Sequence, residues 1–387
     1  MGPYPINYPI TQQRNLNMYT YINNHIHTNY SFSPYTPTTA VQAAAANGLK
    51  TAGIMDHDTC AGSREFLEAA KRIGMPATCG VECRVDMSNT PVRGRRINNP
   101  DQDSIAYVAM HGIPHQYFDE VDSYFAPYRE KRNIRNRAMI DNINDIVSPY
   151  GLYVDFDKDV VPLSTKSITE RHLLFALTKK ITEKYDTPEA AVEFLANKMM
   201  LKLSEKQIGM LLNGRATPQF YEYDILGILK GNLVERFYVD ATDECPPVRE
   251  FIKMVRDHGG IAAYAYLGDV GDSVTGDKKA QKFEDDYLDL LFDQLQILGF
   301  DAVTFMPTRN TPEQLDRVMA LCEEKGFFQI SGEDINSPRQ SFVCKAYEDP
   351  KFAHLIDAAF KLIDYENAAT ADLASAKHEF AYLFKNR

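Results

Sequence analysis

Strand-like and helix-like segments alternate along most of this chain of 387 residues. Short apolar runs are followed by longer amphipathic stretches that stop at Asn-Gly or at Gly, as helices commonly do. Two of these stretches begin at sequences typical of helix starts, Thr36-Pro37 and Thr311 with Gln314 three residues later. The segments that we expect to form strands are residues 21–22, 51–55, 77–81, 105–110, 261–266, 302–306 and 327–331.

The alternation is interrupted once, between about residues 118 and 237, where the sequence signals are almost entirely helical. Parallel strands need helical crossovers, and repeated strand-helix units close most simply into a barrel. We therefore expect an α/β fold, a distorted seven-stranded β/α barrel of TIM-like form with an inserted helical domain. An open doubly wound sheet is the alternative. The expected parts are residues 1–117 and 241–387 for the barrel and C-terminal helices, and 118–240 for the helical insertion.

Charge and composition narrow the class of partner. The net charge is −11, from 42 Lys and Arg against 53 Asp and Glu, and such a field repels an extended nucleic acid. A few cations in a cleft still allow a small anionic substrate. Six cysteines without CxxC spacing, and the lack of a signal peptide or a long apolar run, predict a cytoplasmic protein with reduced thiols and no membrane partner. The sequence leaves the oligomeric state open.

Two polar or mobile segments complete this outline. The Tyr- and Pro-rich N-terminus is expected to be a surface arm, and the Gly- and Asp-rich residues 268–277 are expected to form a flexible lid.

Ionisable side chains stand at or just after the carboxyl ends of several expected strands, where the loops of a barrel converge on one mouth. His25 and His27 are two residues apart in an extended segment, so their imidazoles face the same side. With Glu82 and Asp334 they make a credible divalent-metal site of two nitrogen and two oxygen ligands. The other residues at such positions are Asp56, His57 and His111.

The order and spacing of these motifs resemble the polymerase and histidinol phosphatase (PHP) family. HIHTNYS, IMDHD and GVE resemble its first three motifs, and Glu170-Arg171-His172 resembles its Arg-Pro-His segment. GGIAAYAY resembles the family's strand that ends in Ala-His-Pro, and SGEDIN resembles its closing Gly-Ser-Asp-x-His. The similarity spans nearly the whole chain. It implies a distorted seven-stranded β/α barrel that binds up to three divalent metal ions and hydrolyses phosphoesters.

The resemblance also implies roles for single residues. Asp56 would orient or support the ligand beside it, and His172 would approach the substrate or the metals, so both are candidate catalytic residues. The metal would be Mn, Fe, Zn or Mg. The metal ligands that the resemblance implies are His25, His27, Glu82 and Asp334 for one ion and His57 for another.

Several positions depart from the family pattern. Neutral side chains are poor ligands compared with imidazole or carboxylate, so the second and third metal sites lack ligands that the family uses. His111 offers a partial replacement, because it shares one strand face with residue 107. The four departures, each at the place of a usual acid or histidine, are Phe32, Tyr107, Tyr266 and Asn336.

Arginines near the expected barrel mouth provide candidates for anion binding. Arg171 and Arg309 follow strand or helix ends there, and a guanidinium holds a phosphate bidentately. Our main hypothesis is a metal-dependent phosphoesterase that acts on a small phosphorylated metabolite or nucleotide. The alternatives are a metal-binding protein that senses a ligand without hydrolysing it, and a hydrolase that uses one metal ion on a substrate without phosphate.

Overall fold

The computed structural model describes residues 19–270 and 281–386. The expected N-terminal arm and the centre of the expected lid lie outside the described residues. Among the described residues, no helix combines the length and the apolar character needed to cross a membrane. All six cysteines are buried free thiols.

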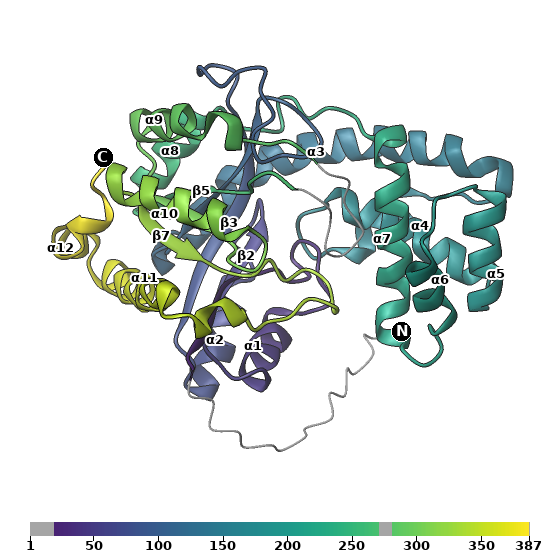
Figure 1. Ribbon diagram of the computed structural model, residues 1–387, viewed down its shortest axis with the longest axis horizontal. Helices are drawn as coiled ribbons and strands as arrows, with labels where there is room; N and C mark the ends of the chain where they lie inside the picture. The colour runs from purple at the N-terminus through teal and green to yellow at the C-terminus, as the bar shows by residue number, and fades with distance from the viewer. Residues whose placement is uncertain (1–18, 271–280, 387) are drawn as a thin grey trace.

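Seven strands form one sheet, and their order in space follows their order in the sequence (Figure 1). The expected barrel is confirmed, and each strand overlaps its expected segment. The third strand continues five residues beyond its expected end, and its residues are buried on both faces through residue 85. The strands are β1 (Tyr21–Ile26), β2 (Leu49–His57), β3 (Ala77–Asp86), β4 (Ile105–His111), β5 (Ile261–Ala265), β6 (Ala302–Phe305) and β7 (Phe328–Ser331).

The expectation of parallel strands throughout is wrong for β4, which runs antiparallel to both β3 and β5. The reason lies in the connection of residues 87–104, which contains no helix and returns the chain along the neighbouring strand. In the β3–β4 register, Glu82 pairs with Ala109 and Gly80 with His111. The carboxyl end of β4 therefore lies at the opposite end of the barrel from the carboxyl ends of β2 and β3.

The barrel nearly closes where β1 meets the segment that follows β7. The His27 amide donates to the Ile335 carbonyl at 2.9 Å, and the Ile335 amide donates to the His25 carbonyl at 3.1 Å. Asn24 Nδ2 donates to the Ser331 carbonyl at 2.9 Å. A Cβ atom at Gly332 would lie 2.8 Å from the His25 amide nitrogen, so only glycine fits this approach of two backbones.

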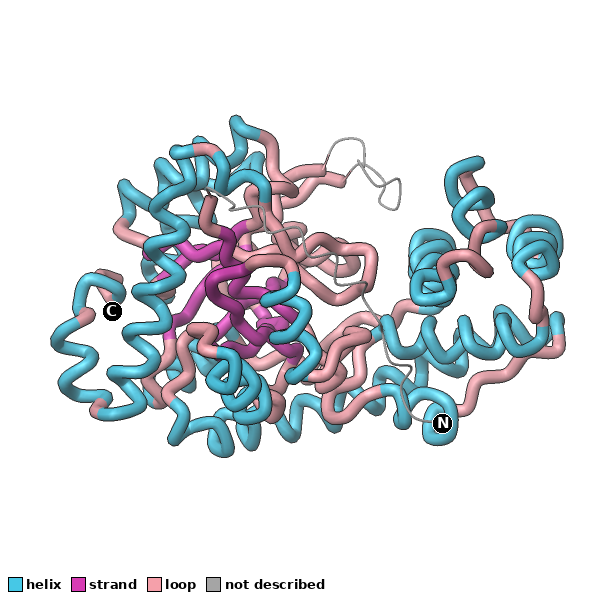
Figure 2. Tube along the Cα trace, turned by 90° about the horizontal axis from the view of Figure 1, so that it is seen from below, coloured by secondary structure: helices cyan, strands magenta, loops and turns pink. Residues whose placement is uncertain are grey.

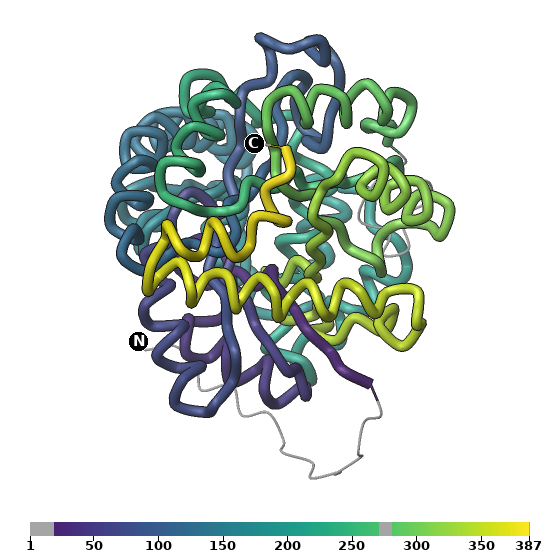
Figure 3. Tube along the Cα trace, turned by 90° about the vertical axis from the view of Figure 1, so that its left-hand side faces the viewer, coloured from purple at the N-terminus to yellow at the C-terminus, as the bar shows by residue number. Residues whose placement is uncertain are grey.

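Helices surround the barrel, and the C-terminal pair covers the end at which β3 begins (Figure 3). There Glu366 accepts hydrogen bonds from the Cys79 amide at 2.9 Å and from Thr78 Oγ1 at 2.6 Å. The helices packed around the barrel are α1 (Pro37–Ala46), α2 (Ser63–Ile73), α8 (Val248–Asp257), α9 (Leu288–Leu298), α10 (Pro312–Lys325), α11 (Ala353–Ala371) and α12 (Leu373–Glu379). Thr36 and Thr311 cap α1 and α10 as the sequence predicts.

Between β4 and β5 the chain forms helices only, and most of them lie to one side of the barrel (Figure 2). Phe118, Val121 and Phe125 at the start of α3 pack in the core of the barrel. The other buried apolar side chains of these helices form a separate cluster that takes only Phe32 from the barrel's part of the chain. We propose on this ground that the segment is a domain of its own. Its helices are α3 (Phe118–Val147), α4 (Glu170–Lys184), α5 (Pro188–Glu193), α6 (Glu205–Leu212) and α7 (Pro218–Phe237).

Glu284 is a fully buried carboxyl group beside β5. It accepts hydrogen bonds from the Tyr264 hydroxyl at 3.0 Å and the Leu267 amide at 2.9 Å. Burial raises the pKa of Glu284 to about 7, although these hydrogen bonds act in the opposite direction. The folded protein therefore binds a proton here more tightly than the unfolded chain does.

We expect Gly332→Ala to destabilise the protein by about 1–3 kcal/mol, because the added methyl group forces β1 and the segment after β7 apart. Urea unfolding measures this change. Gly209→Ala is the matched control: nothing lies within 4 Å of its added Cβ, and alanine favours a helix by up to about 1 kcal/mol over glycine. Equal stability of Gly332→Ala and wild type would contradict the closure described above.

Glu284→Gln tests the buried carboxyl. The stability that protonated Glu284 provides is complete below pH 4.5, the pKa of a glutamate in the unfolded chain. It is lost as the pH rises through about 7, the pKa of Glu284 in the folded protein. Glutamine stays neutral throughout. The variant should therefore gain on wild type by on the order of 1–3 kcal/mol between pH 5 and pH 8. Urea unfolding at both pH values measures the gain, and a difference that does not change with pH would contradict the assignment.

Candidate metal centre

Five side chains from four parts of the barrel bring metal-binding atoms together. His25 Nε2 and His27 Nε2 lie 3.2 Å apart, and His27 Nε2 lies 3.1 Å from Asp334 Oδ1. Glu82 Oε2 is 3.6 Å from His25 Nε2 and 3.1 Å from His57 Nδ1. The four ligands expected for one ion thus meet, and His57, expected for another, adjoins them.

The sheet explains why these residues meet. His25 and His27 lie two residues apart at the end of β1, and the parallel register of β2 and β3 sets His57 directly opposite Glu82. Asp334 follows β7 and is brought to His27 by the backbone hydrogen bonds that close the barrel. The site is therefore assembled by strand pairing, which holds its donors rigidly.

The donors divide into two groups that share His27: one with His25 and Asp334, the other with His57 and Glu82. In each group the donor atoms lie within 4.8 Å of one another. Buried imidazoles with carboxylates suit a divalent transition metal. An imidazole Nε2 has one lone pair, so His27 can serve only one ion.

The protonation states also fit a metal centre. Burial lowers the pKa of His57 to about 3, despite the nearby Glu82, so this imidazole is neutral at physiological pH. Burial acts to raise the pKa of Glu82, but the neighbouring histidines, His25 foremost, outweigh it and lower the pKa. The pKa of Asp334 is well below its usual value, because His27 and His25 outweigh the effect of burial. Both carboxyl groups are therefore ionised and able to bind a cation.

The contacts of Asp56 lead to His27 rather than to His57, the residue it was expected to support. Its carboxylate accepts hydrogen bonds from the Thr28 amide at 2.7 Å, from Thr28 Oγ1 at 2.6 Å and from Ser31 Oγ at 2.6 Å. Ser31 Oγ in turn lies 3.4 Å from His27 Nδ1. The reason is the alternation of the strand, which points Asp56 and its neighbour His57 to opposite faces. Asp56 is fully buried, so it positions the first loop and does not touch a substrate.

His111 is not part of either donor group, so its expected role as a ligand stays a prediction. It stands at the carboxyl end of β4, and that end lies away from the mouth because β4 is antiparallel. Burial lowers its pKa to about 3. Within the described residues its Nε2 has no hydrogen-bond partner. It is a neutral imidazole inside the barrel, and it lies opposite Gly80, two residues before Glu82 on β3.

His172 caps a helix, and its expected role at the substrate stays a prediction. Its Nδ1 accepts a hydrogen bond from the Thr169 amide at 2.9 Å, in the capping box that begins α4. Its ring stands edge-on to Phe32, with 4.9 Å between the centroids. Burial lowers its pKa to about 4. The residue is 1% exposed and serves the junction of helix and barrel.

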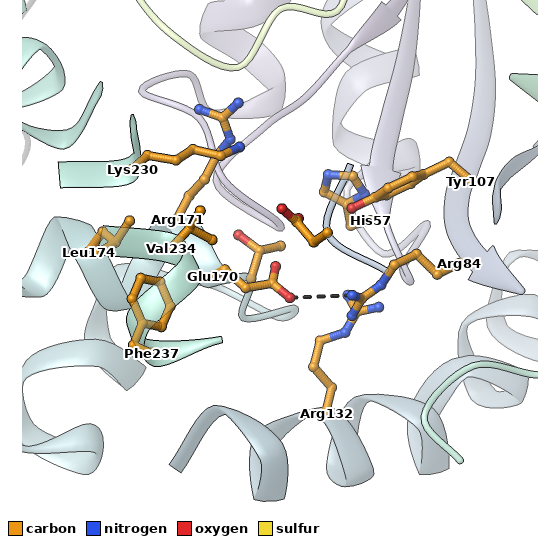
Figure 4. Close-up of a pocket in the computed structure, with 12 residues that line it drawn as sticks. His57, Arg84, Tyr107, Arg132, Glu170, Arg171, Leu174, Lys230, Val234 and Phe237 are labelled. Carbon is orange, nitrogen blue, oxygen red and sulfur yellow. Dashed lines mark ion pairs between the residues drawn. The ribbon is translucent and has the colours of Figure 1, made fainter. Parts of the chain in front are cut away.

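A small pocket, open to solvent, lies between the barrel and the helical segment (Figure 4). His57 and Tyr107 line its barrel side, and Arg171 and Lys230 line its helical side. The other charged residues that line it are Arg84, Arg132, Asp101 and Glu170. Cations therefore outnumber acids around the pocket, which favours an anionic ligand beside the metal centre.

Two of these cations are already neutralised. Arg84 forms ion pairs with Glu244 and, at 3.4 Å, with Glu170, and Arg132 pairs with Asp58. The helical segment also places Arg171 of α4 and Lys230 of α7 at the pocket.

Arg309 is not among the residues that line this pocket, so its expected role in anion binding stays a prediction. Its Nε points to the Leu267 carbonyl at 3.4 Å and so holds the loop after β5. The sequence reasoning missed Lys230, because no motif marks it and only the folding of α7 against the barrel brings it to the site.

The four departures from the family pattern have separate places. Tyr107 lines the pocket, and Asn336 Nδ2 donates to Asp334 Oδ1 at 2.7 Å. The Tyr266 hydroxyl donates to Asp285 Oδ1 at 2.6 Å, and Phe32 packs in the helical cluster. Two of the four therefore adjoin the metal centre, and two are used elsewhere.

Comparisons with known proteins agree with this geometry. A solved structure from Bifidobacterium adolescentis, provisionally named a metal-dependent phosphoesterase, superposes with a TM-score of 0.55 at 19% identity and covers 87% of this chain and 96% of its own. An amidohydrolase from Chromobacterium violaceum, solved with bound sulfate and without metal, gives a TM-score of 0.53 at 18% identity and covers 84% and 90%. These likenesses concern the fold. No curated protein matches the chain.

The family comparison covers β1 to β4 and the first helices of the helical segment. Residues 23–195 match the family model of the PHP domain, and this range holds four of the five converging donors. This part of the chain is therefore similar to the PHP domain.

Proposed function

We propose that the protein is a metal-dependent hydrolase, and more narrowly a phosphoesterase that acts on a small phosphorylated metabolite or nucleotide. The observation that carries this proposal is the meeting of five metal-binding side chains, three of them buried, beside a pocket lined by Arg171 and Lys230. The similarity to the PHP domain and the names of the two structural relatives support the hydrolase class.

One set of residues would bind a divalent cation, and another would bind the anionic phosphate. His25, His27, His57, Glu82 and Asp334 would hold one or two divalent ions such as Mn, Fe, Zn or Mg. Such an ion lowers the pKa of a water molecule toward neutrality and withdraws charge from a phosphoryl oxygen. Arg171 and Lys230 would bind the phosphate from the helical side and orient phosphorus toward the centre.

Tyr107 supplies a proton donor where the family commonly has histidine. Burial raises the pKa of its hydroxyl, which therefore stays protonated. Its ring centroid lies 6.1 Å from that of His57, on the barrel side of the pocket. In this position the hydroxyl can donate a hydrogen bond to a substrate oxygen as negative charge develops there.

A binding or sensing protein without hydrolysis is the second candidate. It is favoured by Tyr266, which occupies the place of a family histidine and is engaged with Asp285 away from the donors. Metal analysis of the purified protein separates the two. Two or more ions per chain favour catalysis, and none favours the second candidate. A hydrolase of substrates without phosphate would bind metal and leave phosphomonoesters intact.

His27→Ala should remove both bound metal and phosphatase activity, because this imidazole belongs to both donor groups. We expect turnover to fall by at least about 100-fold, since changes to residues that merely support ligands cost about 10–100-fold. Elemental analysis and release of inorganic phosphate from a panel of phosphomonoesters measure the two effects. His354→Ala, an exposed histidine on α11, is the control. Full metal-dependent activity of His27→Ala would refute the assignment.

Arg171→Met and Lys230→Met should raise KM by about 10–100-fold each, as expected for a lost charge-assisted hydrogen bond. Metal content should not change, because neither residue is a ligand. Steady-state kinetics on the best substrate of the panel measures the effect. Lys179→Met is the matched control, since it removes a cation of α4 that pairs with Glu222 of α7 on the exposed surface. If all three variants behave alike, the anion site lies elsewhere.

A further inference from the structure

The residue that follows His57 has an unusual backbone conformation. Asp58 has φ of +52°, in the left-handed region that residues other than glycine rarely adopt. Its residue surface is 3% exposed. The turn directs the chain out of β2 directly after a metal-binding side chain, so whatever holds Asp58 also sets where His57 points.

Three contacts hold Asp58 from two directions. Its amide donates to the Glu82 carbonyl at 2.8 Å, which joins it to β3. Its carbonyl accepts from Arg129 Nη1 at 2.6 Å, and its carboxylate forms an ion pair with Arg132. Both arginines belong to α3, the first helix of the helical segment. A strained backbone persists only where its surroundings determine it in this way.

The ion pair belongs to a buried network that joins the helical segment to the barrel. Arg132 Nε lies 3.4 Å from Glu244, and Glu244 also pairs with Arg84 and, at 2.6 Å, with Arg135. Because these groups are almost wholly buried, the position of α3 relative to β2 and β3 is fixed by paired charges rather than by apolar contact alone.

We propose that Asp58 is a positioning residue for His57, and that its ion pair with Arg132 couples helix α3 to the metal centre. This inference rests on the metal centre of the proposed function. The inference goes beyond the proposed function by assigning a role to Asp58, a residue that neither binds metal nor lines the pocket. Partners that orient a ligand commonly change metal affinity by about 10–100-fold when removed.

Calorimetric titration of the full chain with Mn²⁺ tests the proposal without relying on turnover. We expect Asp58→Asn to weaken Mn²⁺ binding by about 10-fold or more. Asp58→Gly should weaken it similarly, although glycine adopts a positive φ freely, because it too lacks the carboxylate. The double variant Asp58→Asn with Arg132→Met removes both charges of the pair. It therefore leaves no unpaired buried charge from this pair that could itself cause misfolding. Asp119→Asn is the control, since it breaks an exposed pair with Arg64 that also involves α3.

A double-mutant cycle with His57 separates the positioning of His57 from a general loosening of the metal centre. In a His57→Ala background, Asp58→Asn should have no further effect on Mn²⁺ affinity, because the ligand that it positions is gone. Additive losses in that background, or wild-type affinity of Asp58→Asn and Asp58→Gly, would overturn the proposal. If wild type binds Mn²⁺ but releases no phosphate from any phosphomonoester, the proposed reaction fails while this inference is still decided by the affinities.

Discussion

Two backbone hydrogen bonds between β1 and the segment after β7 are the constraint on which the site depends. They run from the His27 amide to Ile335 and from the Ile335 amide to His25. Without them the ends of the sheet stay open, and Asp334 has no fixed place beside the histidines. A glycine at position 332 permits this approach, because a Cβ there would meet the His25 amide. The chemistry of the mouth is thus a consequence of how the first strand meets the last.

The helical segment contributes charge to a site that the barrel builds. Arg171 and Lys230 reach the pocket from α4 and α7, while the arginines of α3 are neutralised in a buried network. Buried ion pairs add little net stability, since desolvation offsets most of the attraction, but breaking one is costly. Such a network therefore specifies one arrangement of helix and barrel more than it strengthens the fold. That arrangement sets how far Arg171 and Lys230 lie from the converging histidines and carboxylates.

The sequence predicted what is local and missed what depends on strand direction. His25 and His27 could be paired from their spacing, and Glu82 was found because a parallel strand places it at the mouth. The position of His111 outside both donor groups was not predicted, because nothing within residues 105–111 reveals that the strand is antiparallel; only the helix-free connection before it does. The capping contact of His172 was not predicted either, although Thr169 stands three residues earlier. The place of Lys230 follows from tertiary packing alone.

The lone pair of one imidazole limits what this centre can hold. His27 Nε2 belongs to both donor groups, yet it can bind one ion only. If it serves the group with His25 and Asp334, a second ion keeps just His57 and Glu82 from the protein. Tyr107 and Asn336, where the family has histidines, do not make up the difference, and Asn336 instead donates to Asp334. Oxygens of water or of a phosphate must then complete the coordination of the second ion. Occupancy of the second site should therefore depend on substrate, and the conformation of His57 becomes the protein's main control over that occupancy.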